Sequence, residues 1–422
     1  MVPDGWKRTT LGEVAEFKNG LNFTKADKGE AIKIVGVGDF KDLSELRSTD
    51  LLETIYVNNK VRDEELLEDG DLLFVRSNGN KDLIGRCLFF PAVATRLSYS
   101  GFTIRGRVNK ELALPEYIAS VTRSSMMKQQ ISRSGGGTNI SNLSQQILND
   151  VAFLLPSLPE QKKIAQILST WDKAIITTEQ LLANSQQQKK ALMQQLLTGK
   201  KRLLDENGVR FSGEWKKCTL SSFGKSIRGV SYKPENISEK ESKDTIRLLR
   251  STNIQNGNLN DKDLVILPKE LVKPNQTLEK GDLAICMANG SKALVGKSAP
   301  FEGSDITYTV GAFCAIFRPL SEKNAKFVKF LFESSQYQSQ LLMILAGSSI
   351  NNLKGSDIES IKIFTPICLE EQQKIATVLS TADQEISALQ QKLETLKQEK
   401  KALMQQLLTG RRRVKIDNKE VA

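Results

Sequence analysis

Two long stretches of the chain carry hydrophobic residues at the spacing of a coiled-coil helix. In the second stretch, apolar residues recur alternately four and three positions apart from Ile375 to Leu407, and Lys400 occupies the one place that the series skips. The first stretch keeps the same frame from Ile164 to Leu196. This spacing predicts two long helices, each with the other as its natural partner. Polar residues interrupt the first seam at three places: Thr178, Ser185 and Lys189.

Short apolar runs separated by turn signals fill the rest of the chain. Residues 32–35, 71–75 and 151–155 have the composition of strands, whereas residues 114–119 and 326–332 have the pattern of short helices. Helices and strands are therefore mixed ahead of each long helix. We predict an α+β fold for both of these regions.

The chain repeats one unit twice. Eleven consecutive residues, Lys189 to Gly199, recur letter for letter as Lys400 to Gly410. Weaker matches keep nearly the same offset along the whole chain, such as Trp6 with Trp215. The globular parts match only at glycines, turns and a few apolar anchors. The two copies share their turns and apolar anchors but differ in most other residues of the globular parts. This pattern suggests two similar modules that recognise two different targets.

The repeat and the helix signals divide the chain into six parts. Each long helix is expected to end at a glycine, Gly199 or Gly410, that caps it. The expected parts are a first recognition domain over residues 1–155, a helix over 156–200, a linker over 201–212, a second recognition domain over 213–366, a second helix over 367–410 and a basic tail over 411–422.

Composition narrows the class of protein. The chain has 422 residues, of which 39% are hydrophobic, so several packed domains are expected. It has no apolar run of the roughly 18–20 residues that cross a membrane, and its N-terminus has no signal-peptide pattern. We therefore expect a cytoplasmic protein with no membrane partner. The net charge of +11 favours an anionic partner, most simply nucleic acid, although many soluble proteins are mildly basic.

The residue types most used in catalysis are scarce. The chain has no histidine, which removes the commonest general base and metal ligand, and its five cysteines form no CxxC pair. Residues 290–298 resemble a phosphate-binding loop, but five residues separate the glycines where the motif needs four. The acidic residues Glu160 and Glu371 lie at helix starts, where they suit the helix dipole. We predict that the chain is not an enzyme and holds no metal or cofactor.

The whole chain resembles the specificity (S) subunits of type I restriction–modification enzymes. Both helices share an entry motif and the exit motif Gln-Leu-Leu-Thr-Gly, and each copy begins near a tryptophan. The residues that carry the resemblance are Trp6 and Trp215, Pro156 with Glu160, Gln161, Ile164 and Ala165, Pro366 with Glu371, Gln372, Ile375 and Ala376, and the loops Gly137–Leu143 and Gly347–Leu353.

This resemblance implies a role in recognising double-stranded DNA. Each domain would recognise one half of a split target, while the two helices pack antiparallel, set the length of the unread spacer and dock two methyltransferase (M) subunits. Those subunits would bind S-adenosylmethionine and methylate adenine. Restriction (R) subunits would add cleavage driven by ATP and Mg²⁺. The chain itself would be a non-catalytic specificity subunit with no cofactor of its own.

Loops rich in Arg, Lys, Asn and Ser near the repeated turns are the candidate DNA contacts. Arginine pairs with guanine and asparagine with adenine through two hydrogen bonds each, whereas lysine more often contacts phosphate. The candidates in the first domain are Arg76, Ser77, Asn78, Asn80, Lys81, Arg86, Arg105 and Arg107. Those in the second domain are Arg247, Arg250, Ser251, Asn253, Asn289, Ser291, Lys292 and Lys297.

Several alternatives stay open at this point. A stand-alone DNA-modifying enzyme and a coiled-coil scaffold are the rival functions. The helical seam is either a ruler of about 50 Å or only a docking surface for partner helices. The basic runs 200–202 and 411–413 serve either the helix dipole and solubility or phosphate contact. The glycine loops 135–139 and 347–349 either approach DNA or a partner closely or are ordinary turns.

Overall fold

The computed structural model describes residues 2–24, 26–40, 43–134, 142–347 and 351–416. The chain forms two compact units. The first consists of Met1–Glu179 together with Gln391–Ala422, and the second consists of Gln180–Gln390. Each unit therefore holds one globular domain together with about half of each long helix.

The globular part of the first unit combines two small sheets with short helices. A four-stranded antiparallel sheet has the order β2-β8-β5-β6, a three-stranded sheet has the order β4-β3-β7, and β1 pairs with β9. The strands are β1 (Lys7–Thr10), β2 (Ala15–Asn19), β3 (Glu30–Val35), β4 (Thr54–Val57), β5 (Leu72–Val75), β6 (Cys87–Phe89), β7 (Leu97–Tyr99), β8 (Thr103–Val108) and β9 (Ala152–Leu155). The short helices are α1 (Leu11–Val14), α2 (Pro115–Thr122), α3 (Ser125–Ser134) and α4 (Gln145–Asn149).

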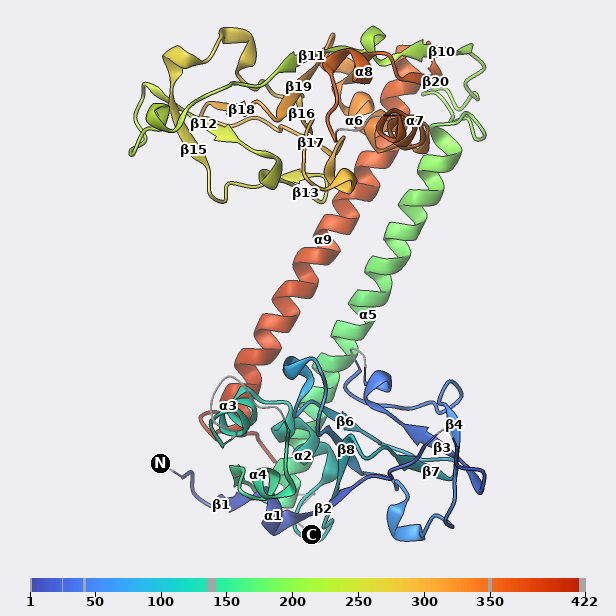
Figure 1. Ribbon diagram of the computed structural model, residues 1–422, viewed down its shortest axis with the longest axis vertical. Coiled ribbons are helices and arrows are strands. Elements are labelled where there is room, and N and C mark those ends of the chain that lie inside the picture. Colours follow the sequence, from blue (N-terminus) through green and yellow to red (C-terminus); the bar gives the residue numbers. More distant parts are fainter. Residues whose placement is uncertain (1, 25, 41–42, 135–141, 348–350, 417–422) are drawn as a thin grey trace. The chain divides into compact units, whose positions relative to one another are not determined.

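The second unit repeats this plan (Figure 1). Its four-stranded sheet has the order β11-β19-β16-β17, its three-stranded sheet the order β15-β12-β18, and β10 pairs with β20. The strands are β10 (Trp215–Thr219), β11 (Gly224–Arg228), β12 (Thr245–Leu249), β13 (Ile254–Gln255), β14 (Asn258–Leu259), β15 (Val265–Pro268), β16 (Leu283–Cys286), β17 (Ser298–Pro300), β18 (Tyr308–Val310), β19 (Cys314–Pro319) and β20 (Lys362–Pro366). The short helices are α6 (Ala325–Glu333), α7 (Ser335–Ala346) and α8 (Gly355–Glu359).

The long helices are α5 (Leu158–Leu196) and α9 (Leu369–Leu408). Their ends close the cores of the two units. In the first unit, Ile164 of α5 and Leu407 of α9 are buried in the main core, and in the second unit Leu196 of α5 and Ile375 of α9 are buried. Each core thus needs the beginning of one helix and the end of the other.

Contacts within each unit show that the two helices run antiparallel. In the first unit, Asp172 pairs with Lys400 and Glu179 with Lys397, so the partner number falls as the helix advances. The second unit has the same order. There Ser185 donates a hydrogen bond to Glu385 (2.9 Å), and Lys189 pairs with Asp383 (2.6 Å). The predicted α+β fold with antiparallel helices is confirmed.

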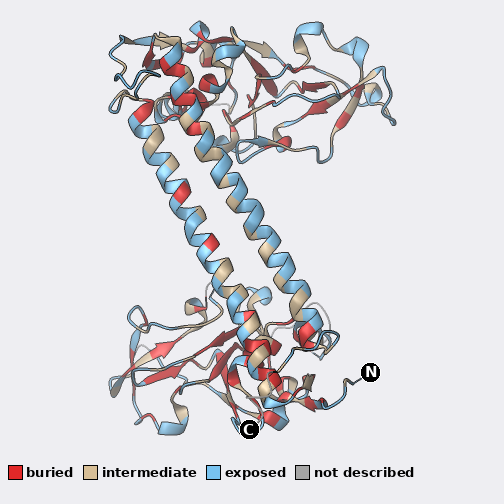
Figure 2. Ribbon diagram, turned by 180° about the vertical axis from the view of Figure 1, so that it is seen from behind, coloured by how far each residue is buried: buried red, intermediate tan, exposed pale blue. Residues whose placement is uncertain are grey.

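Polar residues of the helical seam find partners on the opposite helix. The two equivalent seam lysines, Lys189 and Lys400, each pair with an aspartate, Asp383 or Asp172. Thr178 instead donates to a carbonyl one turn back in its own helix. Figure 2 shows that most residues along the middle of both helices are exposed, with buried and half-buried positions at intervals. The seam is therefore shallow and fixed in register by ion pairs.

The glycine that follows each long helix ends it in the expected way. Gly199 has φ +71° and Gly410 has φ +67°, the left-handed conformation that favours glycine. A side chain at Gly199 would also approach the ring of Trp215 to 3.2 Å. The turn therefore brings the chain directly onto the tryptophan that begins the next globular domain.

The basic runs after the helices have a structural role that we did not anticipate. Arg202 donates two hydrogen bonds to the fully buried carboxylate of Glu371, one of them 2.7 Å long, and its guanidinium stacks 5.5 Å from the ring of Trp215. Arg413 makes the equivalent contacts with Glu160 (2.8 Å) and with the Trp6 ring (5.6 Å). The two glutamates accept charged hydrogen bonds, so the helix-dipole interpretation of them was incomplete.

Candidate DNA interface

The candidate residues that follow strand β5 form one loop with a fixed backbone. Arg76 and Ser77 both donate their backbone N–H to the carbonyl of Phe102, at 2.9 and 3.4 Å. The carbonyl of Arg76 accepts from the N–H of Leu143 (2.7 Å). The loop over residues 76–81 is thus held between the β7–β8 turn and the segment that leads into α4.

The second domain builds the same loop from different residues after β16. Met287 and Ala288 donate to the carbonyl of Phe313, at 2.8 and 3.1 Å, and Leu353 donates to the carbonyl of Met287 (2.8 Å). We call residues 76–81 and 287–292 the strand-exit loops. The two loops share the same backbone hydrogen bonds, which we call their frame, whereas their side chains differ.

The asparagines of the strand-exit loops shape the loops from within. The Asn78 side-chain oxygen accepts from the N–H of Asn80 (2.7 Å), and the Asn289 oxygen accepts from the N–H of Ser291 (2.9 Å). Asn80 in turn accepts from the N–H of Asp82 (3.0 Å). These oxygens are engaged in turns, which argues against the two-bond adenine contact that we considered for asparagine.

A cationic cleft of about 520 Å³ lies beside the first strand-exit loop. It is lined by the candidates Lys81 and Arg86 and by Arg123 and Lys128 of the α2–α3 region, with Asp82 as a lining carboxylate. Sequence reasoning did not single out Arg123 or Lys128. The excess of cations suits an anion such as a DNA phosphate.

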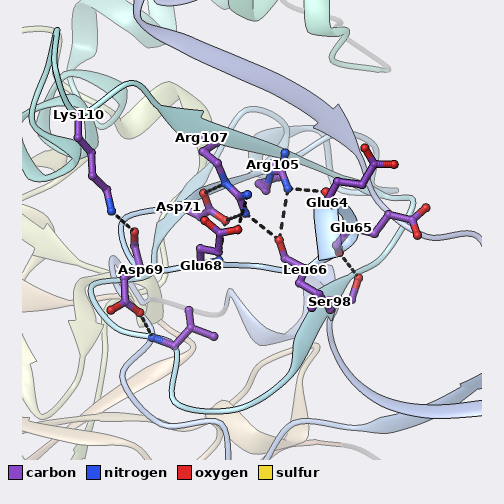
Figure 3. Close-up of polar contacts among 11 residues, drawn as sticks. Glu64, Glu65, Leu66, Glu68, Asp69, Asp71, Ser98, Arg105, Arg107 and Lys110 are labelled. Atoms are coloured by element: carbon purple, nitrogen blue, oxygen red, sulfur yellow. Dashed lines mark hydrogen bonds and ion pairs between the residues drawn. The ribbon is translucent and has the colours of Figure 1, made fainter. Parts of the chain in front are cut away.

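Two candidates of the first domain are engaged within the fold: Arg105 is buried and Arg107 is half-buried. Arg105 is 2% exposed and donates to the carbonyls of Glu64 (2.7 Å) and Leu66 (3.3 Å). Arg107 forms a two-bond ion pair with the buried carboxylate of Asp71, at 3.0 and 2.8 Å. Figure 3 shows both guanidinium groups directed at residues 64–71. Placing the buried Arg105 at a DNA surface was wrong, and the ion pair of Arg107 with Asp71 argues against a DNA contact there, because both side chains already hold the fold together.

The second domain supports this correction. Arg318, which is equivalent to Arg107, forms the same two-bond pair with Asp282, at 3.0 and 2.8 Å. The hydrogen bond to Asp282 raises the pKa of Arg318, which keeps the guanidinium charged. A contact made identically in two domains that differ elsewhere is part of their common frame.

Three candidates of the second domain are also engaged internally. Arg247 pairs with Glu241 (3.0 Å) and donates to the Tyr308 hydroxyl (2.9 Å). Asn253 is 1% exposed, and its side-chain oxygen accepts from the N–H of Arg250 (2.8 Å). Asn253 is therefore a buried turn residue, and its selection as a DNA contact was wrong. Arg250 itself is exposed and donates to a backbone carbonyl (2.7 Å).

The remaining candidates of the second domain gather around its strand-exit loop. Ser251 accepts a hydrogen bond from the Asn289 amide (3.3 Å), which joins the end of β12 to this loop. Ser291 and Lys292 are exposed, and the Lys297 ammonium lies 3.4 Å from the carbonyl of Ile254. These residues stay candidates for DNA contact.

The glycine loops are only partly described. Residues 135–139 and 348–349 lie outside the described residues. Gly347 is described, and its φ of −81° is one that any residue adopts. A side chain there would meet other atoms only at 3.8 Å. The fold of this chain therefore does not itself require glycine at this position, and close approach to DNA or a partner stays one of the two open interpretations.

Other classes of site find no support in the described part of the chain. Among those residues no group of three or more His, Cys, Asp or Glu side chains could hold a metal ion. The described helices include none with the length and hydrophobicity needed to span a bilayer. The segment that resembles a phosphate-binding loop forms a 3-10 turn (Lys292–Leu294) followed by β17.

Comparisons with known proteins agree with this architecture. The model of the type I restriction modification DNA specificity domain matches residues 3–185 and again residues 212–398. The chain therefore belongs to the type I restriction–modification specificity family, and it carries that family's domain twice.

Similar proteins carry the same description. The specificity subunit of the type I restriction enzyme EcoKI from Escherichia coli is 36% identical over 209 residues, which is 49% of this chain and 44% of that protein. This match thus spans less than half the length of the E. coli relative. The MjaVIII specificity subunit of Methanocaldococcus jannaschii is 25% identical over 98% of this chain and 94% of its own.

Solved structures show that the fold is shared over nearly the whole chain. The crystal structure of the S subunit of a type I system from M. genitalium has a TM-score of 0.60 at 16% identity and covers 96% of both chains. A chain from a structural study of assembly and conformational transition in a type I system has a TM-score of 0.56 at 19% identity, covering 97% of this chain and 98% of that one.

Proposed function

We propose that this chain is the DNA-recognition subunit of a type I restriction–modification complex, in which each globular domain recognises one half of a bipartite double-stranded DNA target. The observation that carries the proposal is the doubled specificity domain, built on two strand-exit loops with one backbone frame and different side chains. Two such loops suit two different half-sites. The net charge of +11 suits a polyanionic partner.

The candidate contacts divide by chemistry. In the first domain, Arg76 and Ser77 occupy the strand-exit loop, and the cationic cleft with Lys81 and Arg86 would hold the DNA backbone. In the second domain the exposed Lys292 has the same place after the loop asparagine as Lys81. Backbone contacts fix the position of the protein, and the divergent loop side chains would supply the sequence preference.

The partners and cofactors follow from the family. We infer that two methyltransferase subunits dock on the helices and domains, that they bind S-adenosylmethionine, and that restriction subunits use ATP with Mg²⁺. This chain would contribute no catalytic group and would act in the cytoplasm, where the DNA lies. The ion-paired seam of α5 and α9 would set the spacer between the half-sites.

The decisive experiment maps adenine methylation by the complex of this chain with its methyltransferase subunits on a random DNA library. We expect a split motif with an unread spacer. A double variant, Arg76→Ala with Ser77→Ala, should change the preference for one half only. Methylation without sequence preference would instead favour a scaffold, and methylation by the lone chain would favour a stand-alone enzyme.

The spacer function needs a separate test. Seven residues inserted into α5 between Leu182 and Lys189, with seven inserted into α9 between Leu393 and Lys400, keep the apolar seam in phase. The ruler proposal predicts a changed spacer with both half-site sequences retained. An active complex that still recognises the original spacing would show that the domains, not the helices, set it.

A further inference from the structure

Two phenylalanines occupy equivalent exposed positions in the two domains. Phe102, in the β7–β8 turn, is 66% exposed, and Phe313, in the β18–β19 turn, is 71% exposed. Neither is among the candidate DNA contacts named from the sequence. A single exposed apolar side chain is ordinary on a protein surface. The same exposed aromatic at the same point of two divergent domains indicates a role that both domains share.

The backbone of each turn is fixed by the same hydrogen bonds. The residue that opens the turn, Ser100 or Gly311, donates to the last residue of the neighbouring strand, at 3.0 and 2.9 Å. The residue after the phenylalanine, Thr103 or Cys314, donates back across the turn, at 2.9 and 2.8 Å. Each exposed ring is therefore carried by a rigid turn, not by a loose loop.

The same turns are bound directly to the strand-exit loops. The carbonyl of Phe102 accepts both N–H groups of Arg76 and Ser77, and the carbonyl of Phe313 accepts those of Met287 and Ala288. In the first domain the Arg76 guanidinium also lies 3.4 Å from the carbonyl of Gly101. Each phenylalanine is thus held next to the loop that we propose for base recognition, within polar and cationic surroundings.

We propose that Phe102 and Phe313 are specificity-determining residues that contact bases in the DNA groove, each in the half-site of its own domain. This inference rests on the proposed function. The apolar feature that a base edge offers in the major groove is the C5-methyl group of thymine, and phenylalanine is one of the side chains that contact it. Beside polar loops, the ring would supply the apolar part of the recognition surface.

The basic and amide-rich surroundings favour DNA over a protein partner. Protein interfaces surround an exposed aromatic with other apolar side chains and exclude lysine from their centre. Here the loop next to Phe102 continues into Asn78, Asn80 and Lys81, and the loop next to Phe313 continues into an asparagine, a serine and a lysine. Lysine, serine and asparagine side chains are among those that contact DNA phosphates.

The test compares Phe102→Ala and Phe313→Ala in the complex of this chain with its methyltransferase subunits. Affinity and methylation are measured on the wild-type target and on targets altered in either half. We expect each variant to lose at least about tenfold in affinity, the scale of an interface hot spot. The base preference should weaken only in the half-site of the altered domain. Leu51→Ala, at a residue that is 97% exposed in the first domain, is the matched apolar control and should change nothing.

The outcomes separate this inference from the proposed function. If the wild-type complex shows no sequence preference, the proposed function fails. If the wild type is selective and both alanine variants keep its affinity and preference, only the role of the phenylalanines fails. Loss of methyltransferase-subunit binding, with the selectivity of the assembled complex unchanged, would show that the rings dock a protein. Unchanged thermal unfolding of the variants would establish that each change is local.

A base-analogue scan tests the thymine contact itself. Deoxyuridine replaces each thymine of the target in turn and removes only the C5-methyl group. One buried methyl corresponds to about fourfold in affinity, so one position in each half-site should show that loss with the wild-type chain. Phe102→Ala should be insensitive at the position in its own half-site. Insensitivity of the wild type at every position, or half-sites without thymine, would overturn the thymine contact.

Discussion

Replacing Arg202 by alanine should destabilise the second unit strongly, although Arg202 lies in a run of three basic residues on the surface. Its guanidinium covers the carboxylate of Glu371, which is 0% exposed, and stacks on Trp215. Removing the arginine would leave a buried carboxylate with the Trp215 N–H (3.3 Å) as its remaining side-chain donor. A charge buried in this way is far more costly than a lost surface contact.

The size of the effect follows from burial. Breaking a buried ion pair from one side costs about 3–5 kcal/mol, and a cation–π contact adds about 0.5–1 kcal/mol. The Arg202 side chain is 21% exposed, so water can partly replace it. We therefore expect a loss of about 3 kcal/mol in the free energy of unfolding. The neighbouring residue Lys201 is exposed, and its alanine variant should stay within about 0.5 kcal/mol of the wild type.

Urea titration followed by circular dichroism, with hydrogen exchange of the amides at the start of α9, measures both effects. A further variant, Arg202→Ala with Glu371→Gln, removes the buried charge and should recover a large part of the loss. If the run acted only on the helix dipole, Lys200→Ala, Lys201→Ala and Arg202→Ala would each cost about 0.3–1 kcal/mol. Equal small effects of the three variants would refute the reasoning.

Three further predictions concern the frame. Lys400→Ala should destabilise the first unit by about 1.5–3 kcal/mol in thermal denaturation, because the ion pair of Lys400 with its aspartate partner on α5 is partly buried. Lys397→Ala, in a half-exposed pair, should cost at most about 0.5 kcal/mol. Gly296→Ala should lower the free energy of unfolding in urea by about 1 kcal/mol or more, because φ is +81° and the added carbon would lie 2.3 Å from a leucine of α7. Gly290→Ala, with open space around the added carbon, should leave the stability unchanged. Burial alone would raise the pKa of Asp383, but hydrogen bonds from two lysines lower it. In an acid titration, the stabilisation by Asp383 should therefore be present above the unfolded pKa of about 3.9 and lost as the pH falls through the folded pKa. Asp383→Asn should remove this pH dependence of stability.

The sequence predicted the fold well where periodicity determines it. The heptad seam located both long helices, which the structure gives as Leu158–Leu196 and Leu369–Leu408. The apolar runs over residues 32–35 and 71–75 lie in β3 and β5. The hydrophobic pattern could not show which core each helix end completes, for example that the end of α9 completes the core of the first unit. Hydrophobic spacing shows that a helix has a buried face but does not identify the core that buries it.

The candidate site was harder to predict because a charged residue type does not determine its environment. Arg105 and Arg107 are two residues apart in β8, so their side chains leave the same face of the strand. That face carries both to internal acceptors, namely Asp71 and the carbonyls of residues 64–66. The Asp71 partner lies 36 residues earlier in the chain. Only the sheet pairing brings such residues together, so the local sequence carried no signal of the ion pair.

The internal repeat contains more information about the site than motif matching does. Internal contacts made in both domains, such as the Arg107–Asp71 pair and its counterpart, belong to the frame that the two domains share. Positions with the same backbone hydrogen bonds but different side chains are where the two targets can be distinguished. Ser77 and Ala288 are such a pair, since both donate to a phenylalanine carbonyl and neither is buried. A hydroxyl at one position and a methyl group at the other offer different contacts to a base edge from the same backbone. By this argument the loop side chains should distinguish the two half-sites, while the common phenylalanines add an apolar contact to both.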